Sequence, residues 1–207
     1  MADSGIEQIM ALAPVIPVIV IDRVEDAVPL AEALVAGGLP VLEVTLRTPA
    51  AIDALKAMKT VAGAVVGAGT VLNRSMLRAA VGAGAEFIVS PGLTNDLGEA
   101  AVADGIPFLP GVANAGDIMR GLDLRLDSFK FFPAMASGGI PALKALAGPF
   151  GDVNFCPTGG ITAATAPDWL ALEPVRCVGG SWVVPSGPVD PARIGTLARD
   201  AAALSRH

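Results

Sequence analysis

Short apolar runs alternate with alanine-rich stretches along the whole chain. Eight of these runs are rich in β-branched residues and hold few polar ones, which is typical of strands buried on both faces. The predicted strands span residues 14–21, 40–47, 64–71, 86–92, 106–112, 128–134, 153–160 and 175–182. The stretches between them have helical character, and the predicted helices include 26–38, 49–60, 74–84, 140–150 and 190–206, with a short one over 4–12.

Eight successive strand–helix units in 207 residues predict an α/β fold, a compact (β/α)8 TIM barrel with a short N-terminal helix. We expect one domain over residues 1–207, because no linker, low-complexity tract or long run of charge marks a boundary. An open, doubly wound sheet is the alternative that the same pattern allows. In a barrel, functional side chains gather where the strands end, so polar residues at those ends are the first candidates.

Lys130 falls within a predicted strand, whereas the other three lysines fall in predicted helices. Side chains alternate along a strand, so Phe129 and Phe131 point one way and Lys130 the other. If the two phenylalanines pack under the helices, Lys130 points into the barrel. Loss of water there disfavours the ammonium, and a neutral amine can form a Schiff base with a ketone or aldehyde. The alternative is a structural lysine paired with a carboxylate such as Glu43.

The segment EVTLR places Glu43, Thr45 and Arg47 on one face of a predicted strand. Arginine holds a carboxylate or phosphate in two hydrogen bonds, and a glutamate beside a lysine can move the protons that Schiff-base chemistry requires. A Glu43–Arg47 ion pair that only closes the barrel is the alternative. Thr70 follows GAG at the end of the third strand, where either a ligand contact or a turn would explain it.

Glycine pairs follow the last two predicted strands. TGGI begins at Thr158 and contains Gly159 and Gly160, while GGSW contains Gly180 and Ser181. The loops after strands 7 and 8 of many barrels bind phosphate through backbone N–H groups, and glycine allows the close approach. Bare tight turns are the alternative for these glycines.

Composition narrows the class of protein. The chain is 53% hydrophobic and 16% charged with a mean hydropathy of +0.61, which excludes disorder. Its net charge of −6 argues against nucleic-acid binding. We find no apolar run long enough to cross a bilayer and no secretory signal, so we expect a cytoplasmic protein that does not contact membranes. So apolar a composition also leads us to expect that a partner subunit covers part of the surface.

The inventory of reactive residues excludes several mechanisms. The single histidine is His207, the last residue, so a histidine base, a Ser-His-Asp triad and a histidine-bound zinc are not expected. Cys156 and Cys177 lie in apolar strand-like runs, and we expect buried free thiols rather than a disulfide.

The runs ALVAGGLPVLEVTLRTP, VGAGTVLN, FIVSPGLT, FKFFPA, FCPTGGI and GGSWVVP follow one another along nearly the whole chain. Together they resemble the 2-dehydro-3-deoxy-phosphogluconate (KDPG) and 4-hydroxy-2-oxoglutarate aldolase family. The resemblance implies a class I aldolase, a lyase of the Entner-Doudoroff pathway, that cleaves a phosphorylated keto acid to pyruvate and glyceraldehyde 3-phosphate. It also implies a homotrimer without a metal or other cofactor.

The resemblance further implies roles for individual residues. Lys130 matches the Schiff-base lysine and Glu43 the acid/base residue, which acts through a water on the C4 hydroxyl. Arg47 matches the residue that holds the substrate carboxylate. Thr70 matches a contact on the pyruvate side, and Pro91 lines the site.

At the other end of the substrate, Thr158 matches a hydroxyl near C4 and C5. Gly159, Gly160, Gly180 and Ser181 match the phosphate-binding loops. One departure from the family pattern stands out beside these runs. Glutamate is expected after FFPA, where this chain has Met135, and the change bears on loop shape or substrate tolerance.

Three other functions stay open at this point. The first is a family member acting on the galactonate epimer, which differs at C4, or on 4-hydroxy-2-oxoglutarate, which lacks the phosphate. The second is a phosphosugar isomerase barrel, which needs acid/base residues but no strand lysine. The third is a phosphate-binding protein without catalysis, in which Lys130 and Glu43 neutralise each other.

Overall fold

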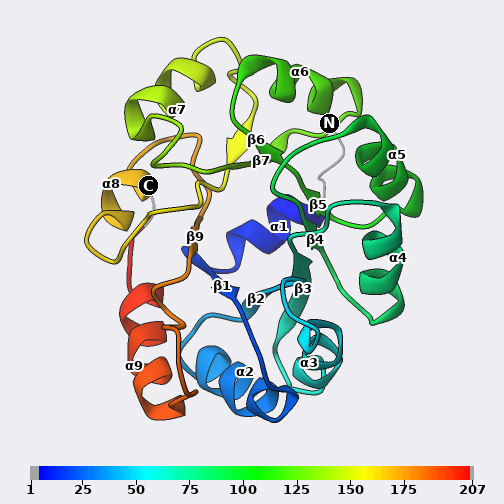
Figure 1. The fold of residues 1–207 in the computed structure, drawn as a ribbon. Coiled ribbons are helices and arrows are strands. Elements are labelled where there is room, and N and C mark those ends of the chain that lie inside the picture. Colours follow the sequence, from blue (N-terminus) through cyan, green and yellow to red (C-terminus); the bar gives the residue numbers. More distant parts are fainter. Residues whose placement is uncertain (1–4, 206–207) are drawn as a thin grey trace.

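Figure 1 shows the computed structural model of the chain, which describes residues 5–205, with helices arranged around a central set of strands. The strands are β1 (Val15–Ile19), β2 (Val41–Thr45), β3 (Val65–Gly69), β4 (Ile88–Val89), β5 (Phe108–Leu109), β6 (Gly111–Val112), β7 (Ser128–Phe131), β8 (Asn154–Phe155) and β9 (Val178–Gly180). The helices are α1 (Gly5–Ala11), α2 (Ala27–Ala36), α3 (Ala51–Met58), α4 (Arg74–Gly82), α5 (Asn95–Asp104), α6 (Ala115–Asp123), α7 (Gly139–Ala147), α8 (Ala166–Leu170) and α9 (Pro191–Ala202), with a 3-10 turn, η1 (Val24–Asp26), before α2.

Parallel pairing closes the strands into a barrel. One run of neighbours is β5-β4-β3-β2-β1-β9, and a second is β6-β7-β8. Strands β5 and β6 are two halves of one segment, divided at Pro110, which has no N–H to donate. Bridges between Phe155 and Val175 and between Thr158 and Gly179 join the β8 segment to the β9 segment. The predicted barrel is therefore confirmed, and the open sheet is excluded.

The apolar side chains of β2 enter two different clusters. Leu42 and Val44 of β2 belong to the large cluster that the strands share with the surrounding helices. Val41 of the same strand belongs to a smaller cluster inside the barrel, which also contains Ile6 and Met10 of α1. Helix α1 therefore covers the end of the barrel at which the strands begin, and it lies near the centre of the view in Figure 1.

Phe129 and Phe131 of β7 pack outward against helices. A Cβ on Gly121 of α6 would lie 2.2 Å from Cε1 of Phe129, so this glycine allows the helix to rest on the ring. The ring of Phe131 lies 6.3 Å from that of Trp169 in α8. Both phenylalanines are fully buried, which confirms the predicted alternation and turns Lys130 toward the barrel interior.

Two further expectations can be compared with the structure. Cys156 and Cys177 are buried, and neither forms a disulfide, as predicted. Among residues 5–205, no helix is long and apolar enough to span a membrane. His207 lies outside the described residues.

Candidate active site

Lys130 and Glu43 meet inside the barrel. The Nζ atom of Lys130 donates a hydrogen bond to Oε1 of Glu43 over 3.0 Å. The two residues are only 6% and 3% exposed. They come from β7 and β2, which are not neighbours in the sheet. Withdrawing two charges from water is costly, and in this position each offsets much of the cost of the other.

The ring of Phe132 lies beside the same amine, 5.4 Å from Nζ to the ring centroid. The face of an aromatic ring attracts a cation at this distance. Phe132 follows the end of β7, and its position agrees with the alternation that places it on the side of Lys130. The alternation in the sequence therefore indicated that Phe132 lies near Lys130, although no function was predicted for Phe132.

Arg47 lies outside the strand in which it was predicted. Strand β2 ends at Thr45, and the N–H of Arg47 donates back to the Thr45 carbonyl over 2.8 Å in a turn. Arg47 is exposed, so the prediction that Glu43, Thr45 and Arg47 share one strand face is wrong for Arg47. The Glu43 carboxylate pairs with Lys130, which disfavours the predicted Glu43–Arg47 alternative.

Two threonines fasten the segment around Arg47 to the end of β1. Thr45 is buried and donates its hydroxyl to the Ile19 carbonyl over 2.7 Å. Thr48 donates in the same way to the carbonyl of Ile21. These side-chain bonds continue the β1–β2 contact beyond the backbone pairing, so the turn that carries Arg47 is held in place. Neither bond was predicted, because only the fold brings β1 beside these hydroxyls.

Thr70 directly follows β3, and Pro91 lies two residues after the end of β4. Thr70 has a φ of 58°, a left-handed conformation that is unusual for a β-branched residue. This observation favours a turn at Thr70, and such strain often accompanies functional sites. Pro91 sits where the chain bends away from β4. A Cβ on Gly111 would lie 2.2 Å from the Pro91 carbonyl oxygen, so the bend rests directly on the next strand.

Thr158 is 5% exposed, and its hydroxyl donates to the Cys156 carbonyl over 3.3 Å. Gly179 on β9 leaves room for it, because a Cβ there would lie 2.2 Å from Oγ1 of Thr158. Gly159 and Gly160 follow with φ values of 104° and 79°, which require glycine. The chain therefore turns sharply in the segment after β8, and Gly160 at this turn is exposed.

Ser181 is exposed at the end of β9 and lines a cavity of about 800 Å³. The other wall of this cavity is the segment after β1, which includes Asp22 and Arg23. Arg23 pairs with Glu25 over 2.8 Å. A hydrogen bond with its own backbone and the charge of Arg23 lower the pKa of the Glu25 carboxyl below its ordinary value. Gly180 packs against Trp182, where a Cβ would lie 2.4 Å from the indole ring.

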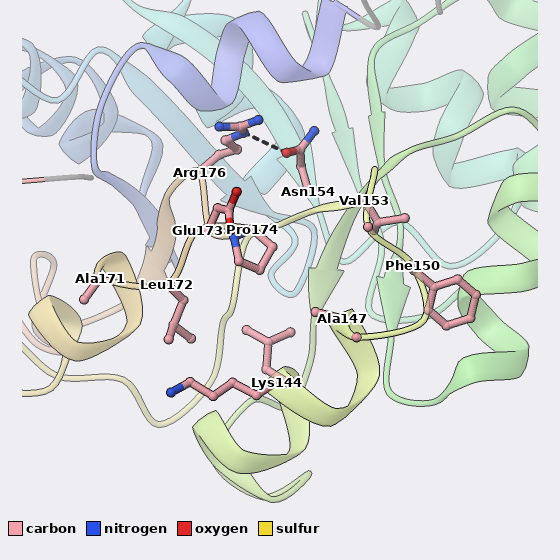
Figure 2. Close-up of a pocket in the computed structure, with 13 residues that line it drawn as sticks. Lys144, Ala147, Phe150, Val153, Asn154, Ala171, Leu172, Glu173, Pro174 and Arg176 are labelled. Carbon is pink, nitrogen blue, oxygen red and sulfur yellow. Dashed lines mark hydrogen bonds between the residues drawn. The ribbon is translucent and has the colours of Figure 1, made fainter.

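Figure 2 shows a second cleft, of about 490 Å³, at the opposite end of the barrel. It lies between α7 and the segments that lead into β8 and β9, and Lys144 is on its wall. Arg176 donates to the Oδ1 atom of Asn154 there over 2.7 Å. The predicted site residues do not line this cleft. Because barrel chemistry belongs to the ends of the strands, the candidate site is the end with Lys130 and Glu43.

The described part of the chain contains no group of three or more His, Cys, Asp or Glu side chains that could hold a metal ion. The candidate site itself presents a buried amine and a buried carboxylate, with hydroxyls and backbone N–H groups where the neighbouring strands end. An amine that exchanges a proton with an adjacent carboxylate is suited to carbonyl addition.

Known proteins resemble this chain over almost its full length. A model of the KDPG and KHG aldolase family matches residues 6–197. The 2-dehydro-3-deoxy-phosphogluconate aldolase of Zymomonas mobilis is 63% identical over 201 residues, 97% of this chain and 97% of that protein.

Two solved structures of KDPG aldolases are also similar to this chain over almost its full length. The 2-keto-3-deoxy-6-phosphogluconate aldolase of Zymomonas mobilis ZM4 with 3-phosphoglycerate has a TM-score of 0.98 and 62% identity, over 99% of this chain and 98% of that one. The KDPG aldolase of Legionella pneumophila, with pyruvate captured at low pH as a covalent carbinolamine intermediate, has a TM-score of 0.92 and 48% identity, over 95% and 98%.

Proposed function

Because the chain belongs to the KDPG and KHG aldolase family, we propose that it cleaves 2-dehydro-3-deoxy-6-phosphogluconate to pyruvate and glyceraldehyde 3-phosphate. It is then a class I aldolase, a lyase that holds its substrate as a Schiff base on Lys130. The observation that carries this proposal is the buried Lys130–Glu43 contact of 3.0 Å inside the barrel. The carbinolamine of the Legionella relative supports the covalent mechanism.

The first half of the reaction builds the imine. Glu43 takes a proton from the Lys130 ammonium, and the neutral Nζ attacks C2 of the substrate ketone. The carbinolamine that forms gains a proton from Glu43 on its C2 hydroxyl and loses water. The nitrogen lone pair then completes the C=N bond, which leaves an iminium cation beside the Glu43 carboxylate.

The second half of the reaction breaks the C3–C4 bond, protonates C3 and releases pyruvate. Glu43 takes the proton of the C4 hydroxyl, directly or through a water, as C4 becomes an aldehyde carbon. The electrons of the C3–C4 bond move to the iminium nitrogen, and glyceraldehyde 3-phosphate leaves an enamine on Lys130. Glu43 returns its proton to C3, and water hydrolyses the restored iminium to pyruvate and the Lys130 ammonium.

The pairing of Lys130 with Glu43 explains why these steps can occur in a buried site. Glu43 exchanges one proton in turn with the Lys130 nitrogen, the C2 and C4 hydroxyl oxygens and C3. The two partners therefore alternate between an ion pair and a neutral pair, and their summed charge stays zero throughout. A site that is withdrawn from water strongly disfavours net charge, so this balance lowers the barrier to every intermediate.

The remaining predicted residues are proposed to hold the two ends of the substrate. Arg47, on the turn fastened by Thr45, binds the carboxylate next to the ketone in two hydrogen bonds. Thr70 and Pro91, where β3 and β4 end, contact the pyruvate portion. The hydroxyl of Thr158 hydrogen-bonds near C4 and C5.

The phosphate is proposed to lie between the glycine turns after β8 and β9. The N–H groups of Gly159, Gly160 and Gly180 and the hydroxyl of Ser181 supply donors for it. The cavity of about 800 Å³ beside Ser181 offers room at this end. Support also comes from the Zymomonas relative, which was solved with a small phosphorylated acid. Homotrimer formation and a cytoplasmic location stay proposals, which light scattering and cell fractionation test.

A coupled assay for pyruvate release tests the function. We expect release from the phosphogluconate compound to exceed that from its galactonate epimer and from 4-hydroxy-2-oxoglutarate. Lys130→Met abolishes release, whereas the matched control Lys144→Met, in the cleft at the opposite end, leaves it unchanged. Preference for another of the three substrates would overturn the proposed substrate, and an active Lys130→Met enzyme would overturn the mechanism.

A further inference from the structure

Gly69 ends β3 inside the barrel, directly beside the Glu43 side chain. Backbone pairing sets Glu43 opposite Gly67 and Thr45 opposite Gly69. The Glu43 carboxylate therefore extends from its own level to the level of Gly69, toward the end of the barrel where the strands stop. A Cβ on residue 69 would lie 2.3 Å from Oε1, 2.7 Å from Cγ and 2.9 Å from Cδ of Glu43.

The backbone conformation does not explain the glycine. Gly69 is not among the positive-φ glycines, in contrast to Gly159 and Gly160. Alanine is therefore compatible with the φ of residue 69, and only space excludes it. All three of the nearest atoms to such a Cβ belong to Glu43. The oxygen nearest to it is Oε1, the atom that accepts the hydrogen bond from Lys130.

We infer that Gly69 is a positioning residue for the reaction: its missing side chain leaves the space from which the Glu43 carboxylate reaches Lys130. The inference rests on the proposed role of Glu43. An added methyl group must push the carboxylate away, because contacts below 3.0 Å do not persist. Glu43 is 3% exposed, so it has little room to move without giving up its contact with Lys130. A displacement of about 1 Å at a reacting group costs about 100-fold in rate.

Gly67 supplies a matched control on the same strand and the same interior face. The three atoms nearest to a Cβ on Gly67 would be ring atoms of Phe87 at 2.5 Å, whereas those nearest to a Cβ on Gly69 belong to Glu43. We therefore expect Gly67→Ala to displace the Phe87 ring first, so that it reports on a comparable clash inside the barrel that does not involve the Glu43 carboxylate as its nearest neighbour. Gly82→Ala, at a position with no neighbouring atom within 4 Å, measures the effect of the substitution itself.

The kinetic test compares the three glycine variants by pyruvate release. We expect Gly69→Ala to lower kcat about 100-fold with KM within about twofold, because substrate binding does not use the moved carboxylate. Gly67→Ala and Gly82→Ala keep kcat per folded molecule. Wild-type kcat in Gly69→Ala would overturn the inference, as would an equal loss in Gly67→Ala.

A stability cycle tests the same contact without relying on activity. Gly69→Ala is expected to lower Tm in the wild-type background and to have no effect in a Glu43→Ala background, where the obstructing side chain is gone. Equal losses in both backgrounds would show that Glu43 does not fill the space and would overturn the inference. Cleavage by Glu43→Ala at the wild-type rate would instead overturn the proposed function, while the cycle still reports on the contact.

Discussion

The Nζ atom of Lys130 on β7 lies 3.0 Å from Oε1 of Glu43 on β2, across a separation of 87 residues in sequence. Lys59 and Glu86 form a second Lys–Glu contact of the same length at the surface. The two contacts differ in burial: the side chains of the surface pair are 33% and 40% exposed, and those of the interior pair 7% and 3%. The surface pair is therefore a control that has the same distance between its charged atoms but remains accessible to water.

Removing one partner of the interior pair should destabilise the fold strongly. We expect Lys130→Met to lower the free energy of unfolding by about 3–5 kcal/mol, because it leaves the Glu43 carboxylate buried without its partner. Lys59→Met is the matched control and should change it by about 0–1 kcal/mol. Urea denaturation measures both. Equal losses in the two variants would mean that Glu43 is not effectively buried.

Neutralising Glu43 should slow the reaction far more than it weakens binding. Glu43→Gln keeps the shape of the side chain but cannot accept the protons of the cycle. We expect kcat to fall about 100- to 10,000-fold. The surface variant Glu86→Gln should keep kcat. Steady-state pyruvate release is the measurement, and a Glu43→Gln enzyme within about twofold of the parent would contradict a proton-transfer role.

Lys130 and Arg47 show which side-chain directions the sequence could predict and which it could not. The segment FKF predicted that Lys130 points into the barrel. Strand side chains alternate, and the two phenylalanines were expected to pack under the helices on the opposite face. The same reasoning failed at Arg47, because the alternation of polar and apolar residues continues past Thr45, where strand β2 ends. Only the observed hydrogen bonds define that boundary.

The pairing of distant residues was harder to predict. Sequence reasoning offered Glu43 to Lys130 as one alternative, but the distance depends on barrel closure and strand register. The interpretation of GAG as a close backbone approach missed the role of Gly69, since the space beside Gly69 is filled by a residue of the neighbouring strand. Contacts between residues of different strands leave no recognisable pattern in the sequence around either residue.

Ser181→Ala should separate phosphorylated from unphosphorylated substrates. The hydroxyl is proposed to donate to phosphate, and a hydrogen bond to a charged group contributes about 1.5–3 kcal/mol. We expect the KM for the phosphogluconate compound to rise about tenfold or more, with the KM for 4-hydroxy-2-oxoglutarate unchanged. Comparative kinetics on the two substrates provide the test. A parallel rise for both would contradict a phosphate contact at Ser181.

Thr158→Val should reduce discrimination between the C4 epimers. Valine keeps the shape of the side chain above Gly179 and removes the hydroxyl proposed to bind near C4 and C5. We expect the kcat/KM ratio of the gluconate to the galactonate compound to fall about tenfold, as for the loss of one hydrogen bond. Thr60→Val, at an exposed position after α3 and away from the candidate site, is the control. An unchanged ratio in Thr158→Val would place the discrimination elsewhere.

The covalent trapping of pyruvate tests the Schiff base most directly. The enzyme is incubated with pyruvate, reduced with borohydride and analysed by intact mass and peptide mapping, alongside Lys130→Met and Lys144→Met. We expect one pyruvate adduct, located on Lys130, in the parent and in Lys144→Met, and none in Lys130→Met. An unlabelled Lys130, or an adduct on another lysine, would contradict the central claim that Lys130 forms the imine.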